Sequence, residues 1–207
     1  MKEKSIAIMG GTFDPIHYGH LVTAQAVKEK FGVEKVLFIP TGNPPHKVDR
    51  EVSSSEKRYF MTVLATITNP SFEVSRIEID REGYTYTIDT IRELKNTLSD
   101  DTKIYFITGA DAIHKILTWK EPEKLLKMCE FVAVTRPGYN KDKLFEHIKN
   151  IEKTLKGKIH FLEVPHLDIS SSDLRNRVQE NKSIKYMLPE EVENYIYKFG
   201  LYRKKEI

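Results

Sequence analysis

Two histidines three residues apart follow a pair of glycines near the start of the chain. The stretch is Met9-Gly10-Gly11-Thr12-Phe13-Asp14-Pro15-Ile16-His17-Tyr18-Gly19-His20, between the apolar run 6–9 and the amphipathic run 21–31. This order predicts a strand, a glycine turn and a helix start, with both imidazoles on one helix face. Since a helix N-terminus attracts phosphate, the pair would form a phosphate site without a lysine. Paired histidines at this spacing would equally suit metal ligands or ordinary surface residues.

A second polar stretch lies near the other end of the chain, Ile169-Ser170-Ser171-Ser172-Asp173-Leu174-Arg175. Serines at a helix start are first a capping feature, which accounts for one of the three. Three hydroxyls, free backbone N–H groups and an arginine one turn into the helix would together bind a polyphosphate. Arg177 is a second candidate for the critical cation, but the spacing favours Arg175.

Several classes of protein are excluded by what the sequence lacks. The first stretch has neither G-x-x-x-x-G-K-[ST] nor G-x-G-x-x-G, so it is neither a P-loop nor a dinucleotide fingerprint. The 207 residues carry 33 basic and 30 acidic side chains, a balance that argues against a nucleic-acid binder. No apolar run approaches ~20 residues, so no membrane span is expected. The single cysteine, Cys129, fits a reducing compartment, and no signal peptide precedes the first strand, so we expect a cytoplasmic protein.

Apolar runs alternate with amphipathic runs along the chain. The pattern predicts strands at 6–9, 35–40, 103–108, 131–135 and 159–164, of which 35–40 and 103–108 are buried, and a half-exposed strand at 72–79 near a sheet edge. It predicts helices at 21–31, 56–68, 88–98, 122–128 and 142–155, and a last helix between Pro189 and Gly200. Strand, helix and strand within the first 40 residues indicate a right-handed βαβ unit and a parallel sheet.

Two of these helices have predicted packing faces. In the helix 56–68 the face consists of Tyr59, Phe60, Val63, Leu64 and Ile67, and in the last helix of Tyr195, Ile196 and Phe199. Arg58 is assigned to the solvated face of its helix in preference to a ligand contact.

Polar residues follow the carboxyl ends of the predicted strands, where open α/β sheets bind ligands. The loop Thr41–Lys47 follows one strand, Gly109 and Asp111 follow a second, and Arg136 follows a third. Asp111 would either accept bonds from ribose hydroxyls or cap the next helix. Arg136 would contact a nucleotide or form a salt bridge within its loop. Thr87 is the predicted N-cap of the helix 88–98.

The stretch from Gly10 to His20 resembles the signature of the adenylyltransferases of the HxGH nucleotidyltransferase superfamily, whose core is His-x-Gly-His. Its Thr-Phe-Asp-Pro-Ile-His version is most similar to the bacterial nicotinate-nucleotide adenylyltransferases. That family also carries counterparts of Pro44-Pro45-His46-Lys47, of Thr85-Tyr86-Thr87-Ile88-Asp89-Thr90, of Gly109-Ala110-Asp111, of Arg136-Pro137-Gly138 and of Ile169–Arg175. Ser172 stands where the family has threonine and keeps the hydroxyl. The resemblance covers most of the chain.

We therefore predict an α/β fold with a Rossmann-like, doubly wound, mostly parallel sheet and helices on both faces. A single nucleotidyltransferase domain would span residues 1–207, with a small C-terminal helical part at about 169–207. A homo-oligomer is compatible with the sequence.

The resemblance implies roles for particular residues. His17, His20 and Arg175 would be catalytic. ATP would be bound by Gly10, Gly11, Thr12, Phe13, His17, His20, Gly109, Asp111, Ile169, Ser170, Ser171 and Arg175. The acceptor substrate would contact Thr12, Lys47, Tyr84, Thr85, Thr87, Trp119 and Arg136, with Trp119 stacked on the pyridine ring and Lys47 near the phosphates.

The implied reaction joins ATP and nicotinate mononucleotide into deamido-NAD and pyrophosphate, in NAD biosynthesis. The acceptor phosphate is already ionised near neutral pH, so no general base is required. The histidines, Lys47, Arg175 and Mg²⁺ would supply positive potential, and Mg²⁺ on the ATP phosphates would need no carboxylate cage. Three alternatives stay open: an adenylyltransferase for nicotinamide mononucleotide, one for phosphopantetheine, and a non-catalytic nucleotide-binding protein on the same fold.

Overall fold

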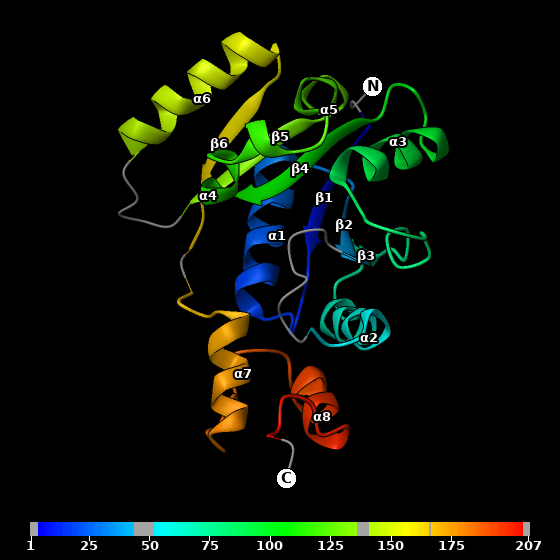
Figure 1. Cartoon of the computed structure of the whole chain (residues 1–207), viewed down its shortest axis with the longest axis vertical. Helices are drawn as coiled ribbons and strands as arrows, with labels where there is room; N and C mark the ends of the chain where they lie inside the picture. The colour runs from blue at the N-terminus through cyan, green and yellow to red at the C-terminus, as the bar shows by residue number, and fades with distance from the viewer. Residues whose placement is uncertain (1–3, 44–51, 136–140, 166, 205–207) are drawn as a thin grey trace.

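The computed structural model describes residues 4–43, 52–135, 141–165 and 167–204. In this part of the chain six strands form one sheet in the order β3-β2-β1-β4-β5-β6, and all five strand pairings are parallel (Figure 1). The strands are β1 (Ser5–Gly11), β2 (Lys35–Pro40), β3 (Phe72–Val74), β4 (Lys103–Gly109), β5 (Glu130–Thr135) and β6 (Ile159–Glu163). This is the strand order of the doubly wound Rossmann-like fold, so the predicted architecture is confirmed.

Helices cover both faces of the sheet (Figure 1). Helices α1 (Tyr18–Phe31) and α2 (Ser55–Thr66) pack on one face. The other face is covered by α3 (Thr87–Thr97), α4 (Ala110–Ile113), the short 3₁₀ turn Ile116–Thr118, α5 (Pro122–Met128) and α6 (Lys141–Leu155). Helices α7 (Ser171–Gln179) and α8 (Glu190–Lys198) lie beyond the carboxyl end of β1, at the bottom of Figure 1.

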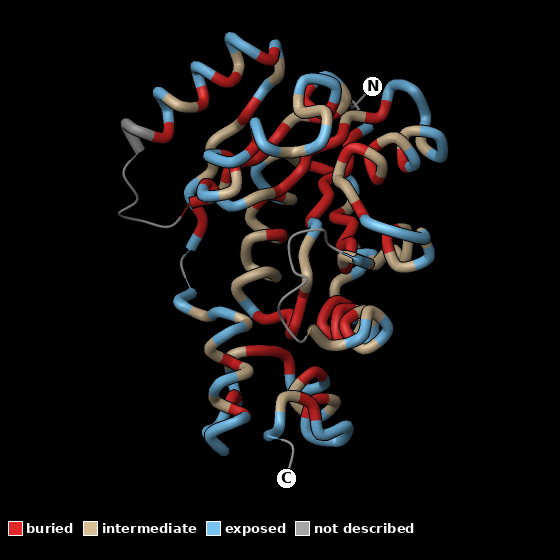
Figure 2. The backbone as a smooth tube through the Cα atoms, in the orientation of Figure 1, coloured by how far each residue is buried: buried red, intermediate tan, exposed pale blue. Residues whose placement is uncertain are grey.

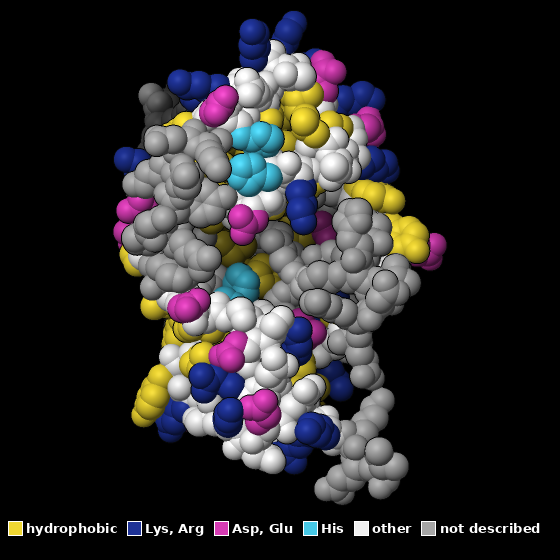
Figure 3. All heavy atoms as spheres, turned by 60° about the vertical axis from the view of Figure 1, so that its left-hand side comes forward, with side chains coloured by type: hydrophobic (Ala, Val, Ile, Leu, Met, Phe, Trp, Pro, Cys, Tyr) yellow, Lys and Arg dark blue, Asp and Glu magenta, His cyan; other side chains and the backbone are white. Residues whose placement is uncertain are grey.

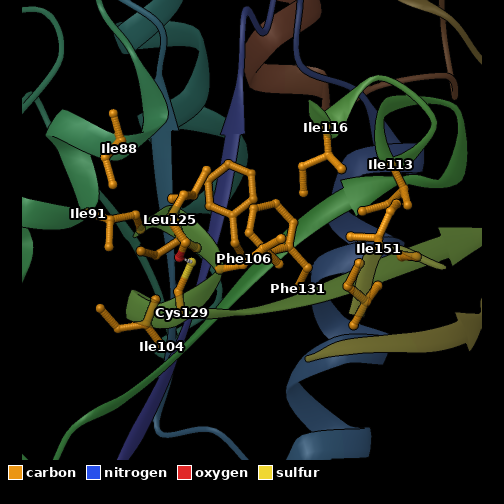
Figure 4. Packing of buried hydrophobic residues seen from close by; sticks show 14 of the residues in the cluster. Ile88, Ile91, Ile104, Phe106, Ile113, Ile116, Leu125, Cys129, Phe131 and Ile151 are labelled. Atoms are coloured by element: carbon orange, nitrogen blue, oxygen red, sulfur yellow. Dashed lines mark hydrogen bonds between the residues drawn. The ribbon is translucent and has the colours of Figure 1, made fainter. Parts of the chain in front are cut away.

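The two cores follow from the alternation of side chains along each strand. In β1, Ile6 and Ile8 join the cluster under α3 to α6, whereas Ala7 and Met9 join the cluster under α1 and α2. Because both faces are covered, the central strands are buried along their length, as Figure 2 shows. Phe106 and Phe131, 5.2 Å apart between ring centroids, occupy the middle of the first cluster (Figure 4). No helix in the described ranges is long and apolar enough to cross a membrane.

Several local predictions are wrong. Strand β3 ends at Val74 rather than at residue 79, because the Ser75 N–H donates to the Phe38 carbonyl and the chain then turns, with the Ile79 N–H donating to the Arg76 carbonyl. The N-cap of α3 is Tyr86, and Thr87 is the first helical residue. In the last helix Ile196 is buried, but Phe199 is 52% exposed.

The predicted buried face of α2 is also wrong. Phe60 is 49% exposed and Ile67 is 69% exposed. The helix instead turns a mixed face inward, made of Arg58, Met61, Thr62, Ala65 and Thr66. The two threonines satisfy their hydroxyls on carbonyls one turn back, so they can be buried at little cost.

Candidate active site

A cleft of about 570 Å³ opens at the carboxyl ends of β1 and β4, where the strand order reverses. Ligands of open α/β sheets bind at this switch point. Eight of the predicted site residues line the cleft: Gly10, Gly11, Thr12, His20, Thr85, Thr87, Gly109 and Trp119. The first motif, the end of β4 and the start of α3 therefore share one cleft, although they are far apart in the sequence.

A smaller hollow of about 180 Å³ continues this cleft over the start of α4. Gly19, Thr23, Gly109 and Val134 line both spaces, and Asp111 lines the second. A molecule longer than one nucleotide can therefore extend from β1 across the end of β4. Figure 3 shows a hollow on this side of the molecule, above the part that contains α7 and α8, with a histidine side chain inside it.

The imidazoles of the two histidines of the first motif are in contact at the start of α1, tilted by 34° to each other. Their ring centroids are 3.9 Å apart, and His17 is buried with 6% exposure. The His17 backbone N–H donates to Nδ1 of His20 at 3.3 Å, which leaves Nε2 of a neutral His20 to carry the proton. Gly19 is required beside them, because a Cβ there would lie 3.0 Å from the His17 ring. His20 thus presents an N–H donor from a wall of the cleft.

Burial lowers the pKa of both imidazoles. The pKa of His17 falls to about 4 through desolvation, and that of His20 to about 3 through desolvation and then the nearby His17. Both rings are therefore neutral at pH 7, which corrects the expectation that they supply positive charge. Nδ1 of His17 is buried without a hydrogen-bond partner among the described residues. Such an unsatisfied group is costly unless something binds to it.

The serines of the second motif are bonded to the protein. Ser170 caps α7 by accepting from the Asp173 N–H at 3.1 Å, as predicted. Ser171 Oγ donates to the Pro15 carbonyl at 2.8 Å, and Ser172 Oγ accepts from Arg175 at 3.2 Å. The structure thus gives each of the three hydroxyls a role within the fold, where the sequence argument accounted for one.

Arg175 connects the two motifs. Its guanidinium donates to the Asp14 carbonyl at 2.7 Å, one residue before the carbonyl that Ser171 holds. Arg177 points elsewhere and pairs with Asp173 at 2.7 Å, so Arg175 is the cation next to the first motif. Ile169 is close by, since its carbonyl lies 3.9 Å from the position of a Cβ on Gly19.

Trp119, Thr85 and Thr87 line the cleft between β4 and α3. The indole of Trp119 meets Phe106 and Phe131 edge-on, with centroids 6.1 and 6.0 Å away. This packing fixes the ring while part of it stays accessible to the cleft. The side chain of Thr85 is buried.

Two further predicted site residues, Phe13 and Tyr84, do not line the cleft. Phe13 is 2% exposed and packs edge-on against His20, at 5.1 Å between centroids, so its side chain belongs to the core. Tyr84 is 53% exposed and is not among the lining residues. Lys47 and Arg136 lie outside the described residues.

Two buried charged residues near the cleft were not predicted as site residues. Arg58, assigned to a solvated face, is 2% exposed, and its guanidinium donates to the carbonyls of Ser53, Thr12 and Gly42. Glu78 lines the cleft and accepts from the Thr90 hydroxyl at 2.8 Å; burial raises the pKa of its carboxyl. The position of Arg58 among apolar residues of a predicted helix could have indicated that it is buried. No sequence feature indicated the burial of Glu78, since its segment alternates like a surface strand.

The sequence of the chain is similar to those of known proteins. The model of the cytidylyltransferase-like family matches residues 8–177. A probable nicotinate-nucleotide adenylyltransferase of a Thermoanaerobacter species is 59% identical over 205 residues, covering 99% of this chain and 97% of that protein. A probable nicotinate-nucleotide adenylyltransferase of Moorella thermoacetica is 56% identical over 198 residues, covering 96% and 91%.

Solved structures give the same fold. The nicotinic acid mononucleotide adenylyltransferase of Plasmodium falciparum, in a complex with NaAD, superposes with a TM-score of 0.77 at 23% identity, over 96% of this chain and 97% of that one. Its complex with APC gives a TM-score of 0.75 at 22% identity, with the same coverage.

Proposed function

Because the chain belongs to the nicotinate-nucleotide adenylyltransferases of the cytidylyltransferase-like family, we propose that it transfers the adenylyl group of ATP to nicotinate mononucleotide. The single observation that carries this proposal beyond the family is the shared cleft. It brings His20 and Gly109 together with Thr85, Thr87 and Trp119 at the switch point of the sheet. One cleft thus has room for two nucleotides side by side.

In the reaction, a phosphate oxygen of nicotinate mononucleotide attacks the α-phosphorus of ATP. A new P–O bond forms, the bond between the α-phosphorus and the bridging oxygen breaks, and pyrophosphate leaves with that electron pair. The acceptor phosphate is largely ionised at pH 7, so the chain need not remove a proton. The residues must instead align two anions that repel each other, by about 4 kcal/mol for two unit charges ~4 Å apart at an effective dielectric of ~20.

The N-terminus of α1 meets this need with a neutral donor. The Nε2–H of His20, on the wall of the cleft, donates a hydrogen bond to a phosphate oxygen. The ring does so without first taking up a proton, because the pKa values of His17 and His20 lie well below 7. Donors held in place before the reaction are the ones that stabilise developing charge, each by about 3–4 kcal/mol.

The acceptor nucleotide occupies the other side of the cleft. The pyridine ring stacks on Trp119, whose indole is held by Phe106 and Phe131, and the hydroxyls of Thr85 and Thr87 are within the same lining. The adenosine of ATP extends toward the second hollow, where Asp111 and Thr135 lie.

Mg²⁺ accompanies ATP in this proposal. The described residues hold no group of three or more histidine, cysteine or carboxylate side chains that would enclose a metal ion. The donors near the cleft fit an ion carried by the phosphates and water, as Mg²⁺ prefers. When bound, Mg²⁺ neutralises charge on the leaving pyrophosphate.

The test is to supply the protein with ATP, Mg²⁺ and one acceptor at a time, and to measure pyrophosphate. We expect release with nicotinate mononucleotide to exceed release with nicotinamide mononucleotide or phosphopantetheine by at least about tenfold. Faster release with either other acceptor would replace the proposed substrate. If none of the three acceptors gives pyrophosphate release, the protein is a non-catalytic nucleotide-binding protein.

A variant tests the placement of the acceptor. Trp119→Leu removes the stacking surface, and base stacking on an aromatic side chain is worth about 1–3 kcal/mol. We expect the KM for nicotinate mononucleotide to rise about tenfold while the KM for ATP stays within twofold. Equal rises in both KM values would contradict a separate acceptor side.

A further inference from the structure

The turn formed by residues 12–15 is held by side chains from three distant parts of the chain. Arg58 of α2 donates to the Thr12 carbonyl at 2.9 Å. On α7, Arg175 donates to the Asp14 carbonyl and Ser171 donates to the Pro15 carbonyl. Tyr202, which follows α8, donates its hydroxyl to the Asp14 carboxylate at 2.6 Å. The turn leads directly into His17 and the start of α1.

Tyr202 lies in the short segment that follows α8. Its backbone has a φ of +63°, and Leu201 before it is buried with 6% exposure. The phenol passes near Met61, with its oxygen 3.9 Å from Sδ. Burial and the adjacent Asp14 carboxylate raise the pKa of Tyr202, so the hydroxyl stays protonated and donates at every working pH. The other Asp14 carboxylate oxygen accepts from the Ser53 N–H at 3.3 Å.

Arg58 forms the other half of the network. Its side chain donates to the carbonyls of Ser53 at 2.9 Å, Thr12 at 2.9 Å and Gly42 at 3.2 Å. Gly42 and Ser53 flank the segment that contains Lys47. Burying a guanidinium is costly, and an apolar side chain would pack a core more cheaply. Only the planar fork of an arginine can hold three carbonyls in fixed directions.

We propose that Tyr202, Asp14 and Arg58 form a positioning network for adenylyl transfer, in which the segment after α8 fixes the turn that precedes His17. The inference rests on the proposed function. None of the three side chains lines the cleft, so they act through the turn and not on the substrates. Displacements of about 1 Å at a reacting group can cost 10²-fold in rate, so the order of this turn is reflected in kcat.

The decisive variant is Tyr202→Phe, which removes one hydroxyl and keeps the ring. We expect kcat for pyrophosphate release to fall about tenfold, with the KM values for ATP and nicotinate mononucleotide within twofold of wild type. The matched control is Tyr197→Phe on α8, whose hydroxyl makes no hydrogen bond to the described residues and whose side chain is 37% exposed. The control should keep the wild-type kcat.

Two further measurements separate positioning from stability. Wild type and Tyr202→Phe are assayed at a temperature at which circular dichroism shows both to be fully folded, so a loss of folded protein cannot lower kcat. The double variant Asp14→Ala with Tyr202→Phe should then have the kcat of Asp14→Ala alone, because that change already removes the acceptor of the Tyr202 hydroxyl. Arg58→Lys keeps the positive charge but lacks the planar guanidinium. It should also lower kcat by a larger factor than it changes either KM.

The proposal is overturned if folded Tyr202→Phe has the wild-type kcat, or if the two single effects multiply in the double variant. It is also overturned if both KM values rise and kcat does not change. Failure of the proposed function would look different, because the wild-type protein itself would then release no pyrophosphate from ATP and nicotinate mononucleotide.

Discussion

The N-termini of α1 and α7 adjoin the same turn, but they are built in opposite ways. At α1, the partner of the His20 imidazole is a backbone N–H, the His17 Nδ1 is unsatisfied within the described chain, and both rings have lowered pKa values. At α7, Ser170, Ser171 and Arg175 all bond to protein atoms.

This difference distinguishes a helix end that binds a ligand from a helix end that stabilises the binding turn. A buried polar atom without a partner costs about 1–3 kcal/mol, so it is retained where a bound molecule supplies the partner. A hydroxyl or guanidinium already bonded to a carbonyl contributes to the shape of the turn instead. We infer that the α1 end acts on phosphates directly and that the α7 end first holds the turn in place.

His20→Ala should have the largest effect. The change removes a donor from the cleft wall, and the loss of one fixed donor typically costs about 10²–10³-fold in kcat. Pyrophosphate release under saturating substrates measures it. His160→Asn is the control, because His160 pairs with Glu130 at the far ends of β5 and β6. A loss of less than about tenfold in His20→Ala would remove this residue from the catalytic group.

Arg175→Ala should have the next largest effect. Loss of a charged hydrogen bond is worth about 1.5–3 kcal/mol, so we expect kcat/KM for ATP to fall by about tenfold or more. Because Arg175 holds the Asp14 carbonyl, we expect the loss to lie in kcat, with the KM for ATP within twofold of wild type. A rise in the KM for ATP would show that Arg175 also contacts the polyphosphate. Arg177→Ala, which removes a surface pair with Asp173, should stay within twofold of wild type.

Most of the fold could be predicted because it depends on local patterns. The apolar run of β2 gives its bounds from the sequence, and Pro122 opens α5 as predicted. Strand β3 could not be bounded, because the alternation of residues 72–79 continues past the point at which Ser75 leaves the sheet. The inward face of α2 was missed because its buried polar residues are satisfied by carbonyls that are distant in sequence or one turn back.

The candidate site was predictable to the extent that its residues lie in short motifs. Gly10 to Thr12, His20 and Gly109 lie at strand ends or just past them, and parallel strands bring such ends together. The roles of Ser171 and Arg175 were not predictable, since the carbonyls that they hold are 156 and 161 residues away in the chain. Tyr202 and Glu78 carry no local signal at all. The role of such a residue depends on the group to which it bonds, and only the folded structure brings that group close.

The lowered pKa values of the histidines predict how stability changes with pH. Below pH 6.5 the unfolded chain protonates His17, but the folded chain does not until about pH 4. The unfolded state therefore binds more protons, and the free energy of unfolding falls as the pH falls from 6.5 toward 4, by at most about 1.4 kcal/mol per unit per histidine. His17→Gln should reduce this slope in urea unfolding between pH 7 and pH 5. Arg175→Ala, on the α7 side, should keep the wild-type slope, and equal slopes for wild type and His17→Gln would contradict the burial of a neutral ring.

Ser172→Ala should have the smallest effect and gives the finest test of the comparison. Ser171 donates to the Pro15 carbonyl at 2.8 Å, whereas Ser172 is exposed and only accepts from Arg175 at 3.2 Å. If α7 supports the turn, Ser171→Ala lowers kcat several-fold and Ser172→Ala stays within twofold, because only the first loses a bond to the turn. If α7 instead presents its hydroxyls to phosphates, the exposed Ser172 is the more accessible donor and the order of the two effects reverses. Measuring kcat and the KM for ATP in both variants under one set of conditions therefore decides between a supporting and a binding role for this helix end.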